Sequence, residues 1–304
     1  MWYSQFTSSI VACTVLVVIA PASGQSCRCE VSDAKEEEFN DLLVLSEDEK
    51  MEAEETHLPW GVPSSPSGAT NEELLHQTHY ILNHDGDLRV PLWAAYRLRD
   101  EDLISRERTE CFRRDPRLTE DDAGFCDDYD EPVFDRGHIV PNADMTRSLE
   151  AMINTYMFSN MAPQHARFNR GIWTTLESYV RDWTRKNGEI FIITGCIFDQ
   201  DGDGARDADD DATLVETGRV AVPTHFYKII LHEGANGFIE NISFLLPHVD
   251  SSPSRTQKDA FLTSHITTID TIEGLTGIDF FSDLEDVKEK AVEKHKANAL
   301  WPRE

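Results

Sequence analysis

The sequence predicts a single α+β domain, in which several strands form a sheet and helices pack against it. Two short apolar segments, residues 80–82 and 90–96, are separated by the turn-forming residues 83–87 and therefore predict a β-hairpin. Residues 173–183 instead carry apolar side chains three and four positions apart, which is the spacing of an amphipathic helix. The chain of 304 residues is long enough to bury a full core between such elements.

More elements are expected after this helix. Residues 190–197 alternate little and are largely apolar, which is typical of a strand that is buried on both faces. The content of β-branched and aromatic residues predicts strands at residues 220–222, 226–231 and 238–246. Helical patterns predict short helices at residues 256–264, 268–275 and 282–299. The last of these helices begins with a capping-box pattern at Ser282.

Residues 1–24 are predicted to be a secretory signal peptide. An apolar run over residues 10–20 is followed by Pro-Ala-Ser-Gly, whose small residues suit a signal peptidase. No Arg or Lys precedes Cys27, which argues against a mitochondrial presequence. The apolar run is too short to span a bilayer comfortably, and no later stretch is long enough. We therefore expect a secreted, extracellular protein with no membrane anchor in the mature chain.

The mature chain is expected to begin with a flexible segment, residues 25–70. Residues 33–55 hold eleven acidic residues against two lysines, and prolines, serines and glycines follow. The folded domain is expected to cover residues 71–304. The sequence does not define the oligomeric state, and a homodimer is one possibility.

Five cysteines remain after the signal peptide is removed, and they are Cys27, Cys29, Cys111, Cys126 and Cys196. In an oxidising compartment this odd number predicts two disulfides and one spare thiol. We expect Cys111 to pair with Cys126, because these two cysteines bracket one loop. The second bridge would then join Cys27 or Cys29 to Cys196.

The charge of the chain is strongly negative. Its 56 acidic and 28 basic residues give a formal net charge of −28, which is the wrong sign for gripping nucleic acid by bulk electrostatics. Residues 139–194 differ, since they hold six basic and five acidic residues. A face built from this segment can be neutral or locally basic. The net charge therefore weighs against tight binding of DNA and not against its cleavage.

Residues 134–145 and 168–173 carry the side chains with the clearest chemistry. The imidazole of His138 can accept a proton from water near neutral pH, and the guanidinium of Arg136 suits phosphate. Gly137 between them permits a sharp backbone turn. Asn169 offers a neutral amide oxygen, which suits a hard and largely hydrated cation such as Mg²⁺. These groups are the components of a phosphodiester hydrolase.

Several short motifs occur together in this part of the chain. Asp-Arg-Gly-His at residues 135–138, Ser-Asn-Met-Ala-Pro-Gln at 159–164, and Asn169 with Trp173 and Glu177 resemble the DNA/RNA non-specific endonucleases, a ββα-metal family. The resemblance covers about residues 72–285. It implies a central, mostly antiparallel sheet flanked by helices, and a metal-dependent enzyme that cuts both DNA and RNA and leaves 5′-phosphate ends.

The resemblance also implies roles for individual residues. His138 would be the general base on water, and Asn169 with a shell of waters would hold Mg²⁺ or Mn²⁺. The residues expected to contact phosphate are arginines: Arg136, Arg181, Arg113 in a loosely aligned stretch, and Arg170, where the family usually has Gln. The residues expected to orient metal-bound waters or to fix the loop and the imidazole are Glu177, Asp135 and Asn160.

The aspartate-rich segment 199–211 matches the spacing of a calcium-binding loop. Acids stand at loop positions one, three, five, nine and twelve, which are Asp199, Asp201, Asp203, Asp207 and Asp210. Gly204 stands at position six, where a sharp turn is needed. Two features depart from the usual loop, because position twelve is Asp instead of Glu and a strand precedes the loop. Calcium binding and a merely solvated acidic loop both remain open.

Two other functions also remain open at this point. A secreted calcium-binding or scaffold protein could keep this fold with a silent site, although the intact His138, Asn169 and Glu177 argue against it. A phosphodiesterase for small nucleotides would use the same groups, and an assay is needed to separate it from an endonuclease.

Overall fold

A seven-stranded antiparallel sheet forms the centre of the protein in the computed structural model, which describes residues 27–65, 71–130 and 132–303. Its strands, in spatial order, are β1 Glu72–His76, β2 Ile81–Asp85, β3 Val90–Arg99, β6 Glu189–Ile197, β7 His225–Glu233, β8 Ile239–Pro247 and β9 Ile266–Thr267. All neighbouring strands are antiparallel. The predicted α+β class and the mostly antiparallel sheet are therefore confirmed, and the predicted signal peptide lies outside the described residues.

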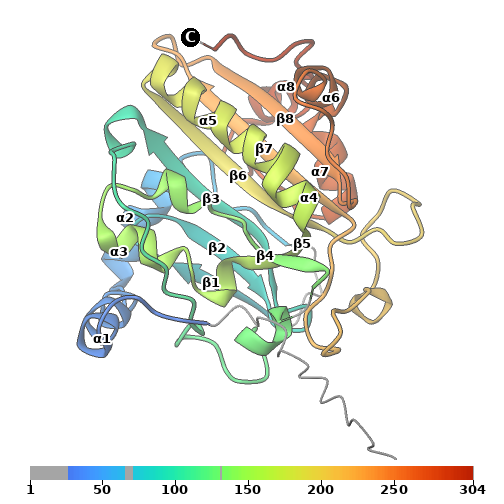
Figure 1. The fold of residues 1–304 in the computed structure, drawn as a ribbon. Coiled ribbons are helices and arrows are strands. Elements are labelled where there is room, and N and C mark those ends of the chain that lie inside the picture. Colours follow the sequence, from blue (N-terminus) through green and yellow to red (C-terminus); the bar gives the residue numbers. More distant parts are fainter. Residues whose placement is uncertain (1–26, 66–70, 131, 304) are drawn as a thin grey trace, which may run out of the picture.

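The central strands are buried on both faces. All five residues of β2 are buried, and so are those of β6 from Ile190 onward. Such strands need cover on each side, and helices supply it. Figure 1 shows α5 in front of β6 and β7, and α2 behind the sheet. The helices are α1 Asp33–Asp41, α2 Glu47–His57, α3 Leu149–Asn154, α4 Ala166–Phe168, α5 Thr174–Asn187, α6 Lys258–Ser264, α7 Ile269–Thr276 and α8 Asp286–Glu293.

A separate two-stranded ribbon carries the Asp-Arg-Gly-His motif. It consists of β4, Phe134–His138, paired with β5, Met161–His165. The ribbon lies in front of the main sheet, near the N-terminal end of α5 (Figure 1). This arrangement brings the motif close to Asn169, which precedes α5.

Two helices lie in the described part of the N-terminal segment, for which the sequence predicted flexibility. Residues 27–65 contain α1 and α2, and Ser46 caps α2 by accepting a hydrogen bond from the backbone N–H of Glu49. The two helices bury only a few apolar side chains, among them Phe39 and Ala53. These few contacts, together with two disulfides, hold an otherwise acidic segment against the domain.

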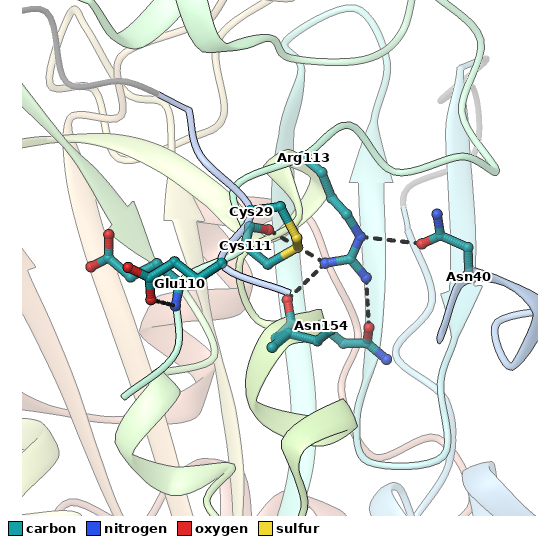
Figure 2. The surroundings of a disulfide bond; sticks show 8 residues. Cys29, Asn40, Glu110, Cys111, Arg113 and Asn154 are labelled. Carbon is teal, nitrogen blue, oxygen red and sulfur yellow. Dashed lines mark hydrogen bonds between the residues drawn. A yellow bond between two sulfur atoms is a disulfide. The ribbon is translucent and has the colours of Figure 1, made fainter. Parts of the chain in front are cut away.

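The disulfides join this segment to residues 111–126. Cys27 pairs with Cys126 and Cys29 pairs with Cys111, whereas Cys196 is a buried free thiol in β6. The predicted Cys111–Cys126 bridge and the bridge to Cys196 are therefore wrong. The N-terminal segment runs beside residues 110 and 111, since the backbone N–H of Glu30 donates to the carbonyl of Glu110. Figure 2 shows the neighbouring disulfide between Cys29 and Cys111. Proximity in space set the pairing here, and the sequence spacing of the cysteines did not reveal it.

Two other elements differ from the sequence prediction. Residues 220–222 do not form a strand, and Ala221 makes only an isolated bridge with Leu214. The last helix, α8, ends at Glu293, because the following chain turns back and the carbonyl of Trp301 accepts a hydrogen bond from Trp183. Within the described residues no helix combines the length and apolar character needed to cross a membrane.

Buried His248 gives the fold a testable dependence on pH. Its Nδ1 contacts the carbonyl of Pro223 at 2.8 Å and its Nε2 accepts from the backbone N–H of His165 at 2.7 Å, so the ring is neutral. Burial lowers the pKa of His248 to about 4. The unfolded chain binds this proton near pH 6.5, so the stabilisation is complete above pH 6.5 and is lost as the pH falls towards 4.

We expect His248→Gln to weaken this pH dependence, because a glutamine amide can both donate and accept without titrating. Between pH 7 and pH 5 the variant should lose roughly 2 kcal/mol less unfolding free energy than the wild type, since one pKa unit corresponds to 1.36 kcal/mol. Urea unfolding at the two pH values measures this difference. Equal losses in both proteins would show that His248 does not contribute to the acid sensitivity.

Candidate active site

A polar pocket of about 650 Å³ lies where the β4–β5 ribbon meets the start of α5. Seven of the nine side chains predicted for the catalytic site line it. The lining residues are Arg108, Glu110, Phe112, Asp135, Arg136, His138, Pro141, Asn142, Ala143, Asn169, Arg170, Thr174, Glu177 and Arg181. With four arginines and three acidic residues, the lining has a positive balance inside a strongly acidic protein.

Strand β4 places Arg136 and His138 two residues apart, so they project on the same side of the ribbon. Gly137 lies between them in the strand, not in a turn as the sequence suggested. A Cβ atom there would lie 2.3 Å from Cδ of Gln164 on β5, so Gly137 is needed for close packing. Asn160 fixes the chain just beyond His138, because its amide bonds both the N–H and the carbonyl of Val140.

The imidazole of His138 is held as a neutral base. Its ring packs edge-on against Tyr156, with 4.9 Å between centroids, and its Nε2 is buried with no hydrogen-bond partner in the described residues. Burial, reinforced by Arg108 and Arg136, lowers the pKa of His138 to about 3, and a hydrogen bond to the backbone of Arg136 opposes this shift. Since Nε2 is unpaired, the nitrogen bonded to that backbone is Nδ1, which leaves the Nε2 lone pair available.

Arg136 is fixed by apolar and sulfur contacts on one side of the pocket. Its guanidinium lies 4.0 Å from the centroid of the Phe112 ring, and Nη1 donates to Sγ of Cys27 at 3.2 Å. Burial lowers the pKa of Arg136, although a guanidinium stays protonated in proteins. The Cys27–Cys126 disulfide is thereby in direct contact with a cationic side chain of the pocket.

Asn169 begins a π-helical turn, residues 169–173, that leads into α5. Such turns offset the side chains of a helix and occur often at functional sites. The amide nitrogen of Asn169 donates to Oδ2 of Asp135 at 3.0 Å, and this fixes the orientation of the amide. Arg170 binds the same carboxylate through two contacts of 2.8 and 2.5 Å. Asp135 thus holds both residues, and the amide oxygen of Asn169 is the atom left to bind a cation.

Buried charges lie beneath the pocket. Arg181 does not pair with Glu177 as the sequence spacing allowed, and instead donates to Asp144 at 2.8 Å. Asp144 also accepts from the hydroxyl of Tyr96 at 2.7 Å. Burial raises the pKa of Glu177, while the nearby ammonium of Lys228 opposes the shift. Lys228 is fully buried and donates to Thr194 at 3.0 Å, so a fixed positive charge lies near this carboxyl group.

Arg113 is not part of this pocket. Its guanidinium donates to the side chains of Asn40 and Asn154 and to the carbonyl of Ile153, with distances of 3.1, 2.7 and 2.8 Å (Figure 2). The residue is only 7% exposed. Arg113 therefore ties α1 to α3, and the structure leaves it no contact with a phosphate in the pocket.

Seven of the lining residues were not predicted from the sequence, and three of these come from one loop. Arg108, Glu110 and Phe112 come from the loop that follows β3, and Arg108 pairs with Glu110 at 2.9 Å. In the sequence this stretch alternates charges and is indistinguishable from a solvated loop. The only signal was the neighbouring Cys111, whose disulfide fixes the loop against the N-terminal segment.

The aspartate-rich loop is only partly assembled as predicted. Ligand atoms of Asp199, Asp201 and Asp203 lie within 4.8 Å of one another. The carboxylate of Asp207 instead accepts from the backbone N–H of Gln200. Asp210 does not belong to this cluster in the described residues. None of the five aspartates lines the catalytic pocket.

A family model and several known proteins match the sequence of this chain. The family model described as DNA/RNA non-specific endonuclease matches residues 63–287. Human mitochondrial endonuclease G is 33% identical over 178 residues, which cover 58% of this chain and 60% of that protein. Nuclease C1 from Cunninghamella echinulata var. echinulata is 31% identical over 228 residues, which cover 71% of this chain and 85% of that one.

A third relative is a much longer protein. Ectonucleotide pyrophosphatase/phosphodiesterase family member 3 from Rattus norvegicus is 26% identical over 288 residues, which cover 86% of this chain and 33% of that one. The chain thus spans less than two thirds of this relative and of the human protein. The match of the family model extends over well more than half of the chain, so the protein belongs to the DNA/RNA non-specific endonuclease family.

Proposed function

We propose that the protein is a secreted, divalent-metal-dependent endonuclease that hydrolyses phosphodiester bonds of DNA and RNA. The observation that carries the proposal is that His138, whose Nε2 has no hydrogen-bond partner in the described residues, lines a pocket together with Asn169 and four arginines. A neutral imidazole can accept a proton from water, and guanidinium groups suit the oxygens of a phosphate.

The side chains around Asn169 fit a metal of the Mg²⁺ type. The Asn169 amide is oriented by its hydrogen bond to Asp135, so it presents a neutral oxygen to the pocket. One protein oxygen with several waters is a common way of binding Mg²⁺, and Mn²⁺ accepts similar ligands. When bound, the cation would neutralise negative charge on the scissile phosphate and on the departing oxygen. Membership in the family implies a divalent metal, generally Mg²⁺.

The remaining residues would position the substrate and the attacking water. Nε2 of His138 would remove a proton from that water, and Glu177 would orient the water through hydrogen bonds. Asp135 and Asn160 would act indirectly, by holding Asn169 and the chain after His138. The side chains proposed to hold phosphate oxygens are those of Arg136, Arg170, Arg181 and Arg108.

Positive charge at the pocket is local, and the protein as a whole is acidic. A net charge of −28 repels polynucleotides outside the pocket, so salt should screen repulsion as well as attraction. This balance favours an enzyme that releases its substrate readily after cleavage over one that binds DNA tightly.

Secretion is supported by the pattern of cysteines. Two disulfides connect the N-terminal segment to the domain, and disulfides persist mainly in oxidising compartments. The proposal of secretion is tested by determining the first residue of the protein that expressing cells release into the medium. A terminus near Gln25 agrees with secretion after signal cleavage, and retention of the first twenty residues contradicts it.

We expect purified protein to nick supercoiled plasmid and to degrade RNA in the presence of Mg²⁺, and to lose both activities in excess EDTA. Adding back Mg²⁺ or Mn²⁺ should restore both, because the cation supplies charge neutralisation that no described side chain of the pocket can replace. Agarose gels of both substrates measure the outcome. Cleavage that continues in EDTA would rule out the proposed metal dependence.

The same assay separates the endonuclease from a phosphodiesterase for small nucleotides. A p-nitrophenyl ester of thymidine 5′-monophosphate can be offered beside the plasmid at matched phosphodiester concentration. An endonuclease should turn over the plasmid at a much higher rate. Turnover of the ester with the plasmid left intact would favour the small-nucleotide enzyme.

A further inference from the structure

The aspartate-rich loop, residues 199–211, follows β6 and has no part in the catalytic pocket. Three of its carboxylates, those of Asp199, Asp201 and Asp203, converge to within 4.8 Å. Convergent carboxylates repel one another unless protons, water or a cation compensate their charge. Asp201 and Asp203 are exposed, so solvent alone could screen these two.

Asp199 is different, because it is buried beneath the other two. Only 8% of the residue is exposed, and its Oδ1 is buried with no hydrogen-bond partner in the described residues. A buried carboxylate oxygen without a partner is costly, because the charged group loses its hydration and gains no hydrogen bond in exchange. Bulk water does not screen this atom as it does the exposed carboxylates, so a partner within the cluster has to compensate it.

The imidazole of His225 interacts with Asp199, but burial lowers the pKa of this histidine, so it is neutral near pH 7 and does not compensate the carboxylate. The nearest arginine in sequence, Arg206, points to the other side of the loop, where it pairs with Asp85 and Asp209 at 2.9 Å each. The ion pairs of the described residues include none to Asp199, Asp201 or Asp203. The cluster is therefore a group of carboxylates that no ion pair of the described residues compensates, and Asp199 contributes to it a buried oxygen without a hydrogen-bond partner.

We propose that Asp199, Asp201 and Asp203 bind a calcium ion that fastens the loop to the sheet. The ligands are hard carboxylate oxygens at loop positions one, three and five, and Ca²⁺ accepts six to eight such oxygens with flexible geometry. Mg²⁺ demands a stricter octahedron and releases its waters reluctantly, so a cluster of three carboxylates suits it less well than it suits Ca²⁺. Water and backbone carbonyls would complete the shell.

The loop forms hydrogen bonds with two other segments of the domain, so an ion bound in the loop would stabilise these segments as well. The backbone N–H of Asp199 donates to the hydroxyl of Thr224, just before β7. Arg206 connects the opposite side of the loop to Asp85 at the end of β2. Calcium would therefore hold together segments that belong to β2, β6 and β7, and its loss would loosen this edge of the domain without altering the catalytic groups.

Calcium titration of the melting temperature tests the proposal on the full mature chain. The protein is first treated with EDTA and then dialysed into millimolar Mg²⁺, so that the catalytic site is kept constant. Calcium at about a hundred times its dissociation constant should raise the melting temperature by about 5 °C. Isothermal calorimetry under the same conditions should give one calcium ion per chain.

The variants are chosen to remove charge without disturbing the fold. Asp201→Asn and Asp203→Asn change exposed residues of the cluster and should abolish both the calcium-dependent shift and the calorimetric signal. The matched control is Asp210→Asn, which removes the same charge from an exposed loop position outside the cluster. This control should respond to calcium as the wild type does.

Three results would overturn the proposal. The first is a wild-type melting temperature that does not respond to millimolar calcium. The second is an Asp203→Asn variant that responds as the wild type does. The third is an equal stabilisation when additional Mg²⁺ replaces calcium. Plasmid cleavage with Mg²⁺, measured well below the melting temperature, should remain unchanged in both cluster variants, because the two metal sites are separate.

Discussion

His138→Ala is expected to lower the rate of plasmid cleavage by about 10²- to 10⁴-fold, the usual contribution of a general base. The ring packs against Tyr156 and its Nε2 has no partner in the described residues, so the nitrogen is positioned for chemistry and not for structure. Initial rates on supercoiled plasmid, with saturating Mg²⁺, measure the loss. The melting temperature should change little, because the truncated ring faces the pocket.

The pH dependence gives this prediction a second test. Since burial lowers the pKa of His138 to about 3, the base is already neutral at pH 5 in the free enzyme. His138 should therefore not cause a loss of activity between pH 7 and pH 5. The control is His295→Ala, which removes an exposed histidine outside the pocket. A His138→Ala enzyme with the turnover of this control would refute the role of His138 as the base.

Asn169→Ala is expected to have the second largest effect, a loss of at least about 10²-fold in cleavage rate at millimolar Mg²⁺. Changes in residues that merely orient metal ligands cost about 10- to 100-fold, and loss of the ligand itself should cost at least as much. The Mg²⁺ concentration for half-maximal rate should also rise, and added Mg²⁺ should restore only part of the activity.

The matched control for this variant is Asn187→Ala at the far end of α5. It removes the same kind of side chain from the far end of the helix that follows Asn169, away from the pocket, and should leave the metal dependence unchanged. If Asn169→Ala and Asn187→Ala required the same Mg²⁺ concentration, Asn169 could not be the ligand. If both variants retained wild-type rates, the whole assignment of the metal position would fail.

The sequence was most informative where chemistry depends on a short motif. His138 and Arg136 lie in one strand, and Asn169 begins the turn that leads into α5, so each short motif occupies one element that borders the pocket. The hairpin and the helix of residues 174–187 were also predictable, because each buries a face whose period is visible in the sequence.

Features that depend on contacts between distant segments could not be predicted in the same way. Arg113 and Arg108 are five residues apart in one loop, and only the folded chain distinguishes the buried one from the one at the pocket. The disulfide partners follow from the path of the N-terminal segment, which no local pattern records. Helices α1 and α2 were not predicted, because their sequences are strongly acidic and contain too few apolar residues to show a helical period.

The two disulfides also determine what proteolysis can do to the protein. The Cys29–Cys111 bridge closes a covalent ring that contains α1, α2 and the strands β1, β2 and β3. A protease that cuts one peptide bond anywhere within this ring produces a nicked chain whose two pieces stay linked. The N-terminal segment therefore cannot be shed from the wall of the pocket by a single cut, and Cys27 remains in contact with Arg136 until the bridges themselves are reduced.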